Sequence, residues 1–155
     1  MRQVFLKFVV AASVLASLSV HAELLGKENL PAPVIDQLNK RHPNAVNISA
    51  LPKKHFNQEL YQIHFKDGEE TLVEYYRQNG HFFVSAPVIE PSGLLPPGTL
   101  DNLKAEFPKH EIKEALQVAN PNGAGEAFDF TLDVSGSLWS VSVDGEGKIT
   151  GKERY

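Results

Sequence analysis

An internal repetition at a fixed spacing limits what this chain can fold into more than any other feature. Residues 30–43 align with residues 95–108 without a gap, at a constant offset of 65, and five of the fourteen positions are identical. The identical pairs are Leu30 and Leu95, Pro31 and Pro96, Asp36 and Asp101, Leu38 and Leu103, and Pro43 and Pro108. Further along the chain the offset becomes 67, so that Gly80 meets Gly147. Self-similarity of this kind is typical of repeated supersecondary units, so we expect two copies of one unit.

Each copy is predicted to open with a short amphipathic helix. Apolar positions recur at spacings of three and four, and they are Ile35, Leu38 and the carbon skeleton of His42 in the first copy and Leu100, Leu103 and Phe107 in the second. Pro43 and Pro108 disfavour helical backbone in the residue before them, so they end both helices. Asp36 and Asp101 fall in the first turns, where an acid complements the helix dipole, and we interpret them as structural.

Four strands are predicted to follow each helix. In the first copy they span residues 45–54, 60–66, 70–77 and 81–84; in the second copy they span residues 111–119, 127–134, 138–144 and 148–151. Asp67-Gly68 and Asn79-Gly80 lie between predicted strands, and such pairs are typical of tight hairpins. The predicted fold class is α+β, with two tandem helix-plus-four-strand antiparallel repeats. We expect the repeats to pair edge to edge into one curved sheet, with the helices on one face, because edge pairing hides open strand edges.

The first 22 residues resemble a secretory signal peptide. Arg2 and Lys7 precede an apolar run over residues 8–20, and Val20 and Ala22 are the small residues expected before a cleavage site. A spanning helix needs roughly 20 apolar residues, so we expect no membrane anchor after cleavage and a periplasmic or secreted bacterial protein. The predicted division is a signal peptide over residues 1–22, a first repeat over 23–86, a linker over 87–94 and a second repeat over 95–155.

Composition excludes several function classes. The chain of 155 residues has no cysteine, which excludes disulfides, thiolate metal sites and a cysteine nucleophile. Its 15 basic residues against 19 acidic ones give a net charge of −4 and form no basic cluster, so a nucleic-acid partner is not expected.

The combination of motifs resembles a known family. A Leu-Pro pair, a hydrophobic helix and a closing Pro, followed by strands that end in Asp-Gly or Asn-Gly turns, is similar to the PepSY-like, β-lactamase-inhibitor-like exported proteins of bacteria. The resemblance covers about residues 28–155. It implies a concave sheet backed by helices, and protein binding without chemistry of its own, which in some relatives inhibits an enzyme. Inhibitory relatives carry disulfides, which this chain lacks, so the target does not carry over.

Strand alternation predicts which side chains the open face of the sheet presents. In the first copy, Gln62, His64 and Lys66 face outward, as do His81, Phe83 and one of the neighbours Tyr75 and Tyr76; Val84 faces inward with Phe82. In the second copy the outward residues include Asp129, Asp133 and Asp144. We take His64, Tyr75, His81, Phe83, Asp129, Asp133 and Asp144 as candidate partner-binding residues, because aromatic side chains beside polar ones are common at protein interfaces. A register slip of one residue, or a segment that covers this face, would remove the patch.

Catalytic and metal sites find little support. Four histidines, His42, His55, His64 and His81, lie in the first copy, but none is spaced as a helical or strand metal-binding pair. No Gly-x-Ser-x-Gly motif occurs. We therefore expect no cofactor and no enzymatic activity. The leading hypothesis is an exported module that binds another envelope or secreted protein, and inhibition or modulation of that protein is one form of the hypothesis. The alternative is a periplasmic protein that binds a small ligand or metal through the His-rich first copy.

Overall fold

The structure is a computed structural model that describes residues 23–155. The predicted signal peptide, residues 1–22, lies outside the described residues. The first half contains β1 (Leu25–Gly26), η1 (Lys27–Asn29), α1 (Ala32–Arg41), β2 (Val46–His55), β3 (Gln58–Asp67), β4 (Glu70–Arg77) and β5 (Phe82–Ser85). The second half contains α2 (Thr99–Glu106), β6 (His110–Ala119), β7 (Glu126–Val134), β8 (Ser137–Asp144) and β9 (Ile149–Arg154). No helix in this described part is long and apolar enough to cross a membrane.

The strands form two antiparallel sheets. One has the order β1-β2-β3-β4-β5 and the other has the order β6-β7-β8-β9. The predicted α+β class is confirmed, and most predicted strands agree with the structure to within two residues at each end. The clearest difference is β9, which continues to Arg154, three residues beyond its predicted end. The single continuous sheet predicted from the sequence is not confirmed, because the two halves keep separate sheets.

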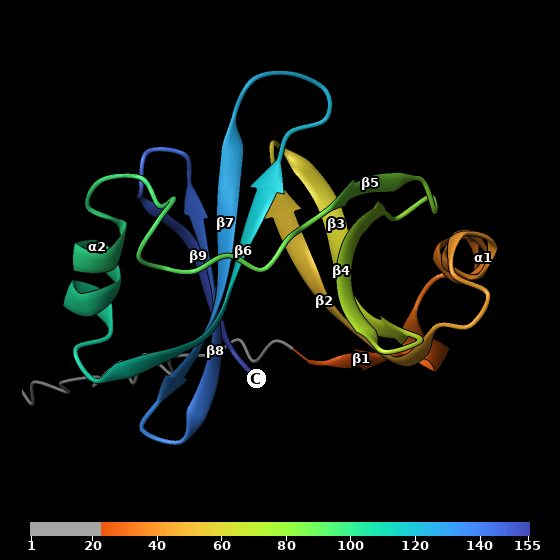
Figure 1. Cartoon of the computed structure of the whole chain (residues 1–155), viewed down its shortest axis with the longest axis horizontal. Helices are drawn as coiled ribbons and strands as arrows, with labels where there is room; N and C mark the ends of the chain where they lie inside the picture. The colour runs from red at the N-terminus through yellow and green to blue at the C-terminus, as the bar shows by residue number, and fades with distance from the viewer. Residues whose placement is uncertain (1–22) are drawn as a thin grey trace, which may run out of the picture.

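The molecule has four layers, with the helices outside and the two sheets facing each other between them (Figure 1). Val34 and Leu38 of α1 pack with Ile63 and Phe65 on the outer face of the first sheet. On the other side, α2 packs against the outer face of the second sheet. A third cluster of buried hydrophobic side chains fills part of the space between the sheets, namely Leu60, Val73, Tyr75, Phe83, Ala86, Leu116, Val118 and Ala127.

The connector after β5 ties the sheets together along one side. Val88 forms an isolated antiparallel bridge with Leu116 of β6. The backbone N–H of Ile89 donates to the carbonyl of Ala115 at 2.8 Å. The sheets are therefore joined between β5 and β6, whereas β9, at the far end of the second sheet, pairs with β8 alone among the described residues.

The turn before the last strand has the same geometry in both halves. Gly80 and Gly147 have φ of +89° and +85°, in the left-handed region that favours glycine. The N–H of Gly80 donates to the carbonyl of Arg77 at 2.9 Å, and that of Gly147 donates to the carbonyl of Asp144 at 3.0 Å. The equivalences expected at an offset of 67 thus hold for this turn.

The core-facing side of the second helix differs from the prediction. Leu100 was expected in the core, but 44% of its surface is exposed. Thr99 is buried instead, and its hydroxyl donates to the carbonyl of Pro96 at 2.8 Å. The reason is the start of α2 at Thr99, after Gly98 with φ of +81°, which turns Leu100 away from the sheet.

A β-bulge also changes the predicted faces at the end of the first sheet. Tyr75 pairs with Val84 and Tyr76 pairs with Phe82, so Phe83 is the extra residue between them. Phe82 packs toward α1 as predicted, whereas Val84 packs against the cluster between the sheets. The expectation that Val84 shares a face with Phe82 was wrong, because a bulge shifts the alternation by one residue.

Candidate functional site

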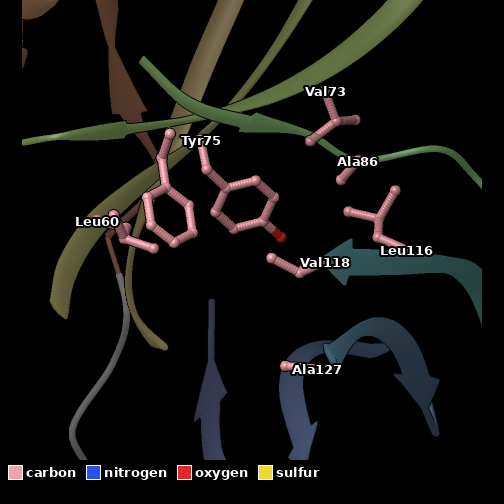
Figure 2. Close-up of a cluster of buried hydrophobic side chains, with 8 residues drawn as sticks. Leu60, Val73, Tyr75, Ala86, Leu116, Val118 and Ala127 are labelled. Atoms are coloured by element: carbon pink, nitrogen blue, oxygen red, sulfur yellow. The ribbon is translucent and has the colours of Figure 1, made fainter. Parts of the chain in front are cut away.

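Seven polar side chains are buried between the two sheets, and we call them the inter-sheet cluster. They are Lys53 and His55 of β2, Gln62 of β3, Tyr75 of β4, Asp129 of β7, and Ser140 and Ser142 of β8. Strand alternation brings them to the inner faces, opposite the faces that pack on the helices. Figure 2 shows the neighbouring apolar cluster, in which the Tyr75 hydroxyl is directed toward Val118.

Asp129 lies at the centre of the inter-sheet cluster. Its Oδ1 accepts hydrogen bonds from Lys53 Nζ at 3.2 Å and from Ser142 Oγ at 2.5 Å. Its Oδ2 accepts a hydrogen bond from Tyr75 Oη at 2.5 Å and lies 2.7 Å from His55 Nε2. Three of these contacts, those with Lys53, His55 and Tyr75, join the second half of the chain to the first.

The remaining members complete the network. Lys53 Nζ donates to Ser140 Oγ at 2.5 Å and to Ser142 Oγ at 3.3 Å. Gln62 Nε2 donates to Tyr75 Oη at 2.7 Å. A buried charge is costly unless it is paired and hydrogen-bonded, and the ammonium and the carboxylate here are both.

The cluster fixes the ionisation of its acidic groups. Burial by itself would raise the pKa of Asp129, but the neighbouring Lys53 and His55 and the hydrogen bond from Ser142 hold it well below its ordinary value. Burial, together with the Asp129 carboxylate, raises the pKa of Tyr75 well above its ordinary value. The carboxylate is therefore an acceptor and the phenol is a donor throughout the physiological pH range.

Serine, histidine, aspartate and lysine meet in this cluster, but they are not arranged for acyl transfer. Such chemistry needs a nucleophile hydrogen-bonded to a base that is itself held by a third group. His55 Nε2 contacts the Asp129 carboxylate rather than a serine, and Ser142 donates its proton to the same carboxylate. Lys53 Nζ contacts Ser140, but it also donates to the Asp129 carboxylate and to Ser142, so it is not a base held for one serine.

A second buried carboxylate, Glu74 of β4, binds α1 to its sheet. Arg41 donates to it through Nη2 at 2.9 Å and Nε at 3.3 Å, and Tyr76 and Ser85 donate to it as well. Burial would raise the pKa of Glu74, but the bonds from Arg41 and Tyr76 and the nearby ring of His42 lower it overall. These contacts are structural, since every partner lies in α1, β4 or β5, or directly after α1.

His64 and His81 are two of the four predicted partner-binding residues that keep part of their surface exposed; the others are Asp133 and Asp144. His64 is half-buried, and its Nε2 lies 2.8 Å from Glu114 Oε1 on the second sheet. His81 is exposed in the turn before β5, where its N–H donates to Asn79 Oδ1 at 3.1 Å. They lie in different places and form no common surface patch.

The other five predicted residues are buried or belong to turns. Tyr75, Phe83 and Asp129 are all buried between the sheets, with at most 3% of their surface exposed. Asp133 accepts the N–H of Gly136 at 2.8 Å, and Asp144 accepts the N–H groups of the turn after β8. The open face expected for Tyr75, Phe83 and Asp129 was wrong, because the two sheets pack against each other. Asp133 and Asp144 are half-buried.

Sequence reasoning missed the contribution of Lys53 and His55. They alternate with Pro52 and Lys54 in β2, so both reach the inner face. The signal was charge complementarity, since the inner face of the first half carries Lys, His and Gln while that of the second carries Asp and Ser. Two polar faces of opposite character predict that they pack on each other.

A polar groove runs between the free sides of the two sheets. It has a volume of about 260 Å³ and is lined by Pro52, Lys53, Lys54 and Glu59 of the first sheet, Ser140 and Ser142 of β8, and Thr150, Gly151, Lys152 and Glu153 of β9. We call it the edge groove. Among residues 23–155, no group of three His, Asp or Glu side chains is placed to hold a metal ion.

No protein-family model matches the chain, and no curated protein matches it. The solved structures that are similar at low identity include the following three. A candidate periplasmic protein from Bacteroides eggerthii is 13% identical with a TM-score of 0.45, covering 81% of this chain and 88% of that chain. A DUF2874 family protein from Bacteroides uniformis is 15% identical with a TM-score of 0.45, covering 80% and 88%. A BLIP-like protein from Bacteroides fragilis is 16% identical with a TM-score of 0.42, covering 81% and 86%. With TM-scores below 0.5, these similarities lead to no conclusion about the function of this chain.

Proposed function

We propose that this chain is an exported, non-enzymatic module that binds another envelope or secreted protein. The observation that carries the proposal is the outer edge of β9 beside the edge groove: within residues 23–155 no strand pairs with it, and polar side chains line the groove. An exposed strand edge is a ready template for another polypeptide. Export rests on the pattern of residues 1–22.

The proposal that the module has no enzymatic activity rests on how its buried polar side chains are engaged. In the inter-sheet cluster the groups that resemble catalytic ones are buried and engaged in one another's hydrogen bonds. The proposal that the bound partner is an enzyme, and that binding inhibits it, rests on the resemblance of the two halves to exported inhibitor-like repeats.

The proposal is tested by capture followed by reconstitution. The mature protein is immobilised and incubated with envelope extract, the retained protein is purified, and binding is measured again by calorimetry with both components pure. We expect saturable one-to-one binding, and inhibition if the partner is an enzyme. Two results together would favour a small-ligand or metal binder instead. One is that no retained protein binds once it is purified, and the other is that calorimetry shows one-to-one binding of zinc, copper or haem.

A further inference from the structure

The outer edge of β9 has a defined set of free backbone groups. The N–H of Tyr155 donates to the carbonyl of Leu138 at 3.0 Å, and Trp139 pairs with Arg154. Hydrogen-bonded and non-hydrogen-bonded pairs alternate along an antiparallel ladder. Glu153 therefore bonds to β8, whereas the N–H and C=O groups of Lys152 and Arg154 point away from it. These groups form the free edge beside the groove.

The side chains on this edge are cationic on one face. Lys152 and Arg154 lie two residues apart, so they share the face that packs on α2. Lys152 contacts Glu106 of α2, with roughly half of each side chain exposed, and such exposed pairs are weak. Arg154 has no carboxylate within 4 Å in the part of the chain that the structure describes. On the opposite wall of the groove, Lys54 is also exposed.

These charges oppose pairing of β9 with a second copy of itself. In antiparallel self-pairing, residues whose amides point outward lie opposite one another. In the registers that align the two cationic ends, Lys152 would then face Lys152 or Arg154 of the second copy. Both registers set two cations opposite each other, and like charges directly opposite are destabilising. Lysine on an edge strand is a common protection against such pairing.

A different strand would fit the same edge if it carried acids at the matching positions. Acidic side chains opposite Lys152 and Arg154 would form cross-strand ion pairs, and each pair adds modest stability. The residue between them would face the inter-sheet side, next to Gly151 and Glu153, where a small hydroxyl side chain avoids both crowding and a second negative charge. The matching sequence is therefore acid, small residue, acid.

From this geometry we propose that β9 binds its partner by strand addition, and that the bound segment is an extended polypeptide with acidic side chains at alternate positions. This inference rests on the proposed protein-binding function and names its partner chemistry. Main-chain hydrogen bonds to Lys152 and Arg154 supply the affinity, and the two cations select the sequence.

The test uses the mature protein and a synthetic peptide, acetyl-Thr-Glu-Thr-Glu-Thr-Glu-Thr-amide. Amide hydrogen exchange is followed by NMR with and without the peptide. We expect the amides of Lys152 and Arg154 to gain protection while those of Gly151 and Glu153, already bonded to β8, change little. The same peptide with Lys in place of Glu should leave all four unchanged. Binding of the acidic peptide without protection of Lys152 and Arg154 would overturn strand addition.

Variants separate the charge from the backbone. Lys152→Glu combined with Arg154→Glu should weaken peptide binding at least about tenfold, because both attractions become repulsions. Lys152→Pro removes an outward N–H that β8 does not use, and it should weaken binding more than its matched control Lys152→Ala. Equal affinity for Lys152→Pro and Lys152→Ala, with both variants folded by Trp139 fluorescence, would contradict the main-chain contact.

The two proposals fail separately. If the captured partner binds one-to-one but the peptide protects neither amide, the protein is a binding module that uses another surface, and only the inference about β9 is wrong. If the peptide protects both amides but the captured partner binds equally well to the Lys152→Glu and Arg154→Glu double variant, that partner does not use this edge, and the inference is again wrong for it.

Discussion

At the scale of single residues, Asp129 determines how the two halves hold together. It is the acceptor for one lysine, one tyrosine and one serine, and it contacts one histidine; at most 8% of the surface of any of these five residues is exposed. Such a network is stable only while each member keeps its partner. One substitution that removes the charge and preserves the size of the side chain therefore tests the whole cluster.

We predict that Asp129→Asn lowers the free energy of unfolding by about 3–5 kcal/mol, because it leaves Lys53 buried without a counter-charge. The matched control is Asp133→Asn in the same strand, where an amide oxygen can still accept the N–H of Gly136. The control should cost less than about 1 kcal/mol. Urea denaturation measures both values, and equal effects of the two variants would show that the inter-sheet cluster contributes little.

The buried carboxylates also predict how stability depends on pH. The pKa values of Asp129 and Glu74 are lower in the folded protein than their ordinary values, which are about 3.9 and 4.3 in unfolded chains. Each carboxylate therefore contributes its full stabilisation above the unfolded pKa and loses it as the pH falls toward the folded one. The free energy of unfolding should decline from about pH 5 downward, measured by urea denaturation between pH 7 and pH 3.

The Glu74→Gln variant should be less stable at pH 7 but should show a shallower decline, because one of the two titrating groups is gone. Its difference from the unmodified protein should shrink as the pH approaches 3. If the difference is the same at every pH, the carboxylate of Glu74 does not contribute through its charge.

At the scale of elements, the turns at Gly80 and Gly147 lie in close contact with the segment that begins the helix of the same half. A Cβ at Gly147 would lie 2.9 Å from the carbonyl oxygen of Pro97 and 2.9 Å from Thr99 Oγ1, closer than such atoms pack. Gly136 has the same φ of +85°, but nothing lies within 4 Å of its Cβ position. The two sites therefore differ in crowding and not in backbone conformation.

We predict that Gly136→Ala costs about 1–2 kcal/mol, the penalty for a left-handed residue with a side chain. Gly147→Ala should cost about 2 kcal/mol more, because backbone and a buried side chain must also move. Thermal or urea denaturation of the two variants gives the difference directly. Equal costs would mean that the turn and α2 are not in close contact.

The sequence predicted the elements better than their assembly. Alternation and turn residues give strand positions because a strand exposes two faces in a two-residue period. The buried face at the start of α2 was harder to predict, because Thr99 is buried there while a search for apolar residues selects Leu100. The bulge at Phe83 was not predictable either, since one extra residue leaves no mark in composition.

The candidate site was predicted only in part for a related reason. Alternation led us to place Tyr75 and Asp129 on the face of each sheet that points away from the helix. Alternation does not say what covers that face. Each sheet is covered by the other half of the chain. The two halves are held face to face by the contacts of Lys53 and His55 with Asp129, which lies 74 to 76 positions away in sequence. Only the complementary charges of the two inner faces indicated that contact.

At the scale of the whole molecule, the two halves should behave as one cooperative unit. They share a buried apolar cluster to which Leu60 contributes from the first half and Leu116 and Val118 from the second, and the inter-sheet cluster adds ionic contacts across the same interface. Each half alone has about 60 residues, a size at which a lone domain is marginal. Neither half is therefore expected to keep its structure when the other unfolds.

Leu60→Ala tests this coupling, because Leu60 belongs to the first half while Trp139, the only tryptophan, packs beside Phe107 in the second. Truncating a buried leucine costs about 2–5 kcal/mol. We predict that the urea transition seen by Trp139 fluorescence shifts by the same free energy as the transition seen by amide exchange in β3. The control Leu100→Ala, at an exposed position, should move both transitions by less than about 0.5 kcal/mol. If Leu60→Ala shifts the β3 transition and leaves that of Trp139 in place, the halves unfold independently and the shared interface contributes little to stability.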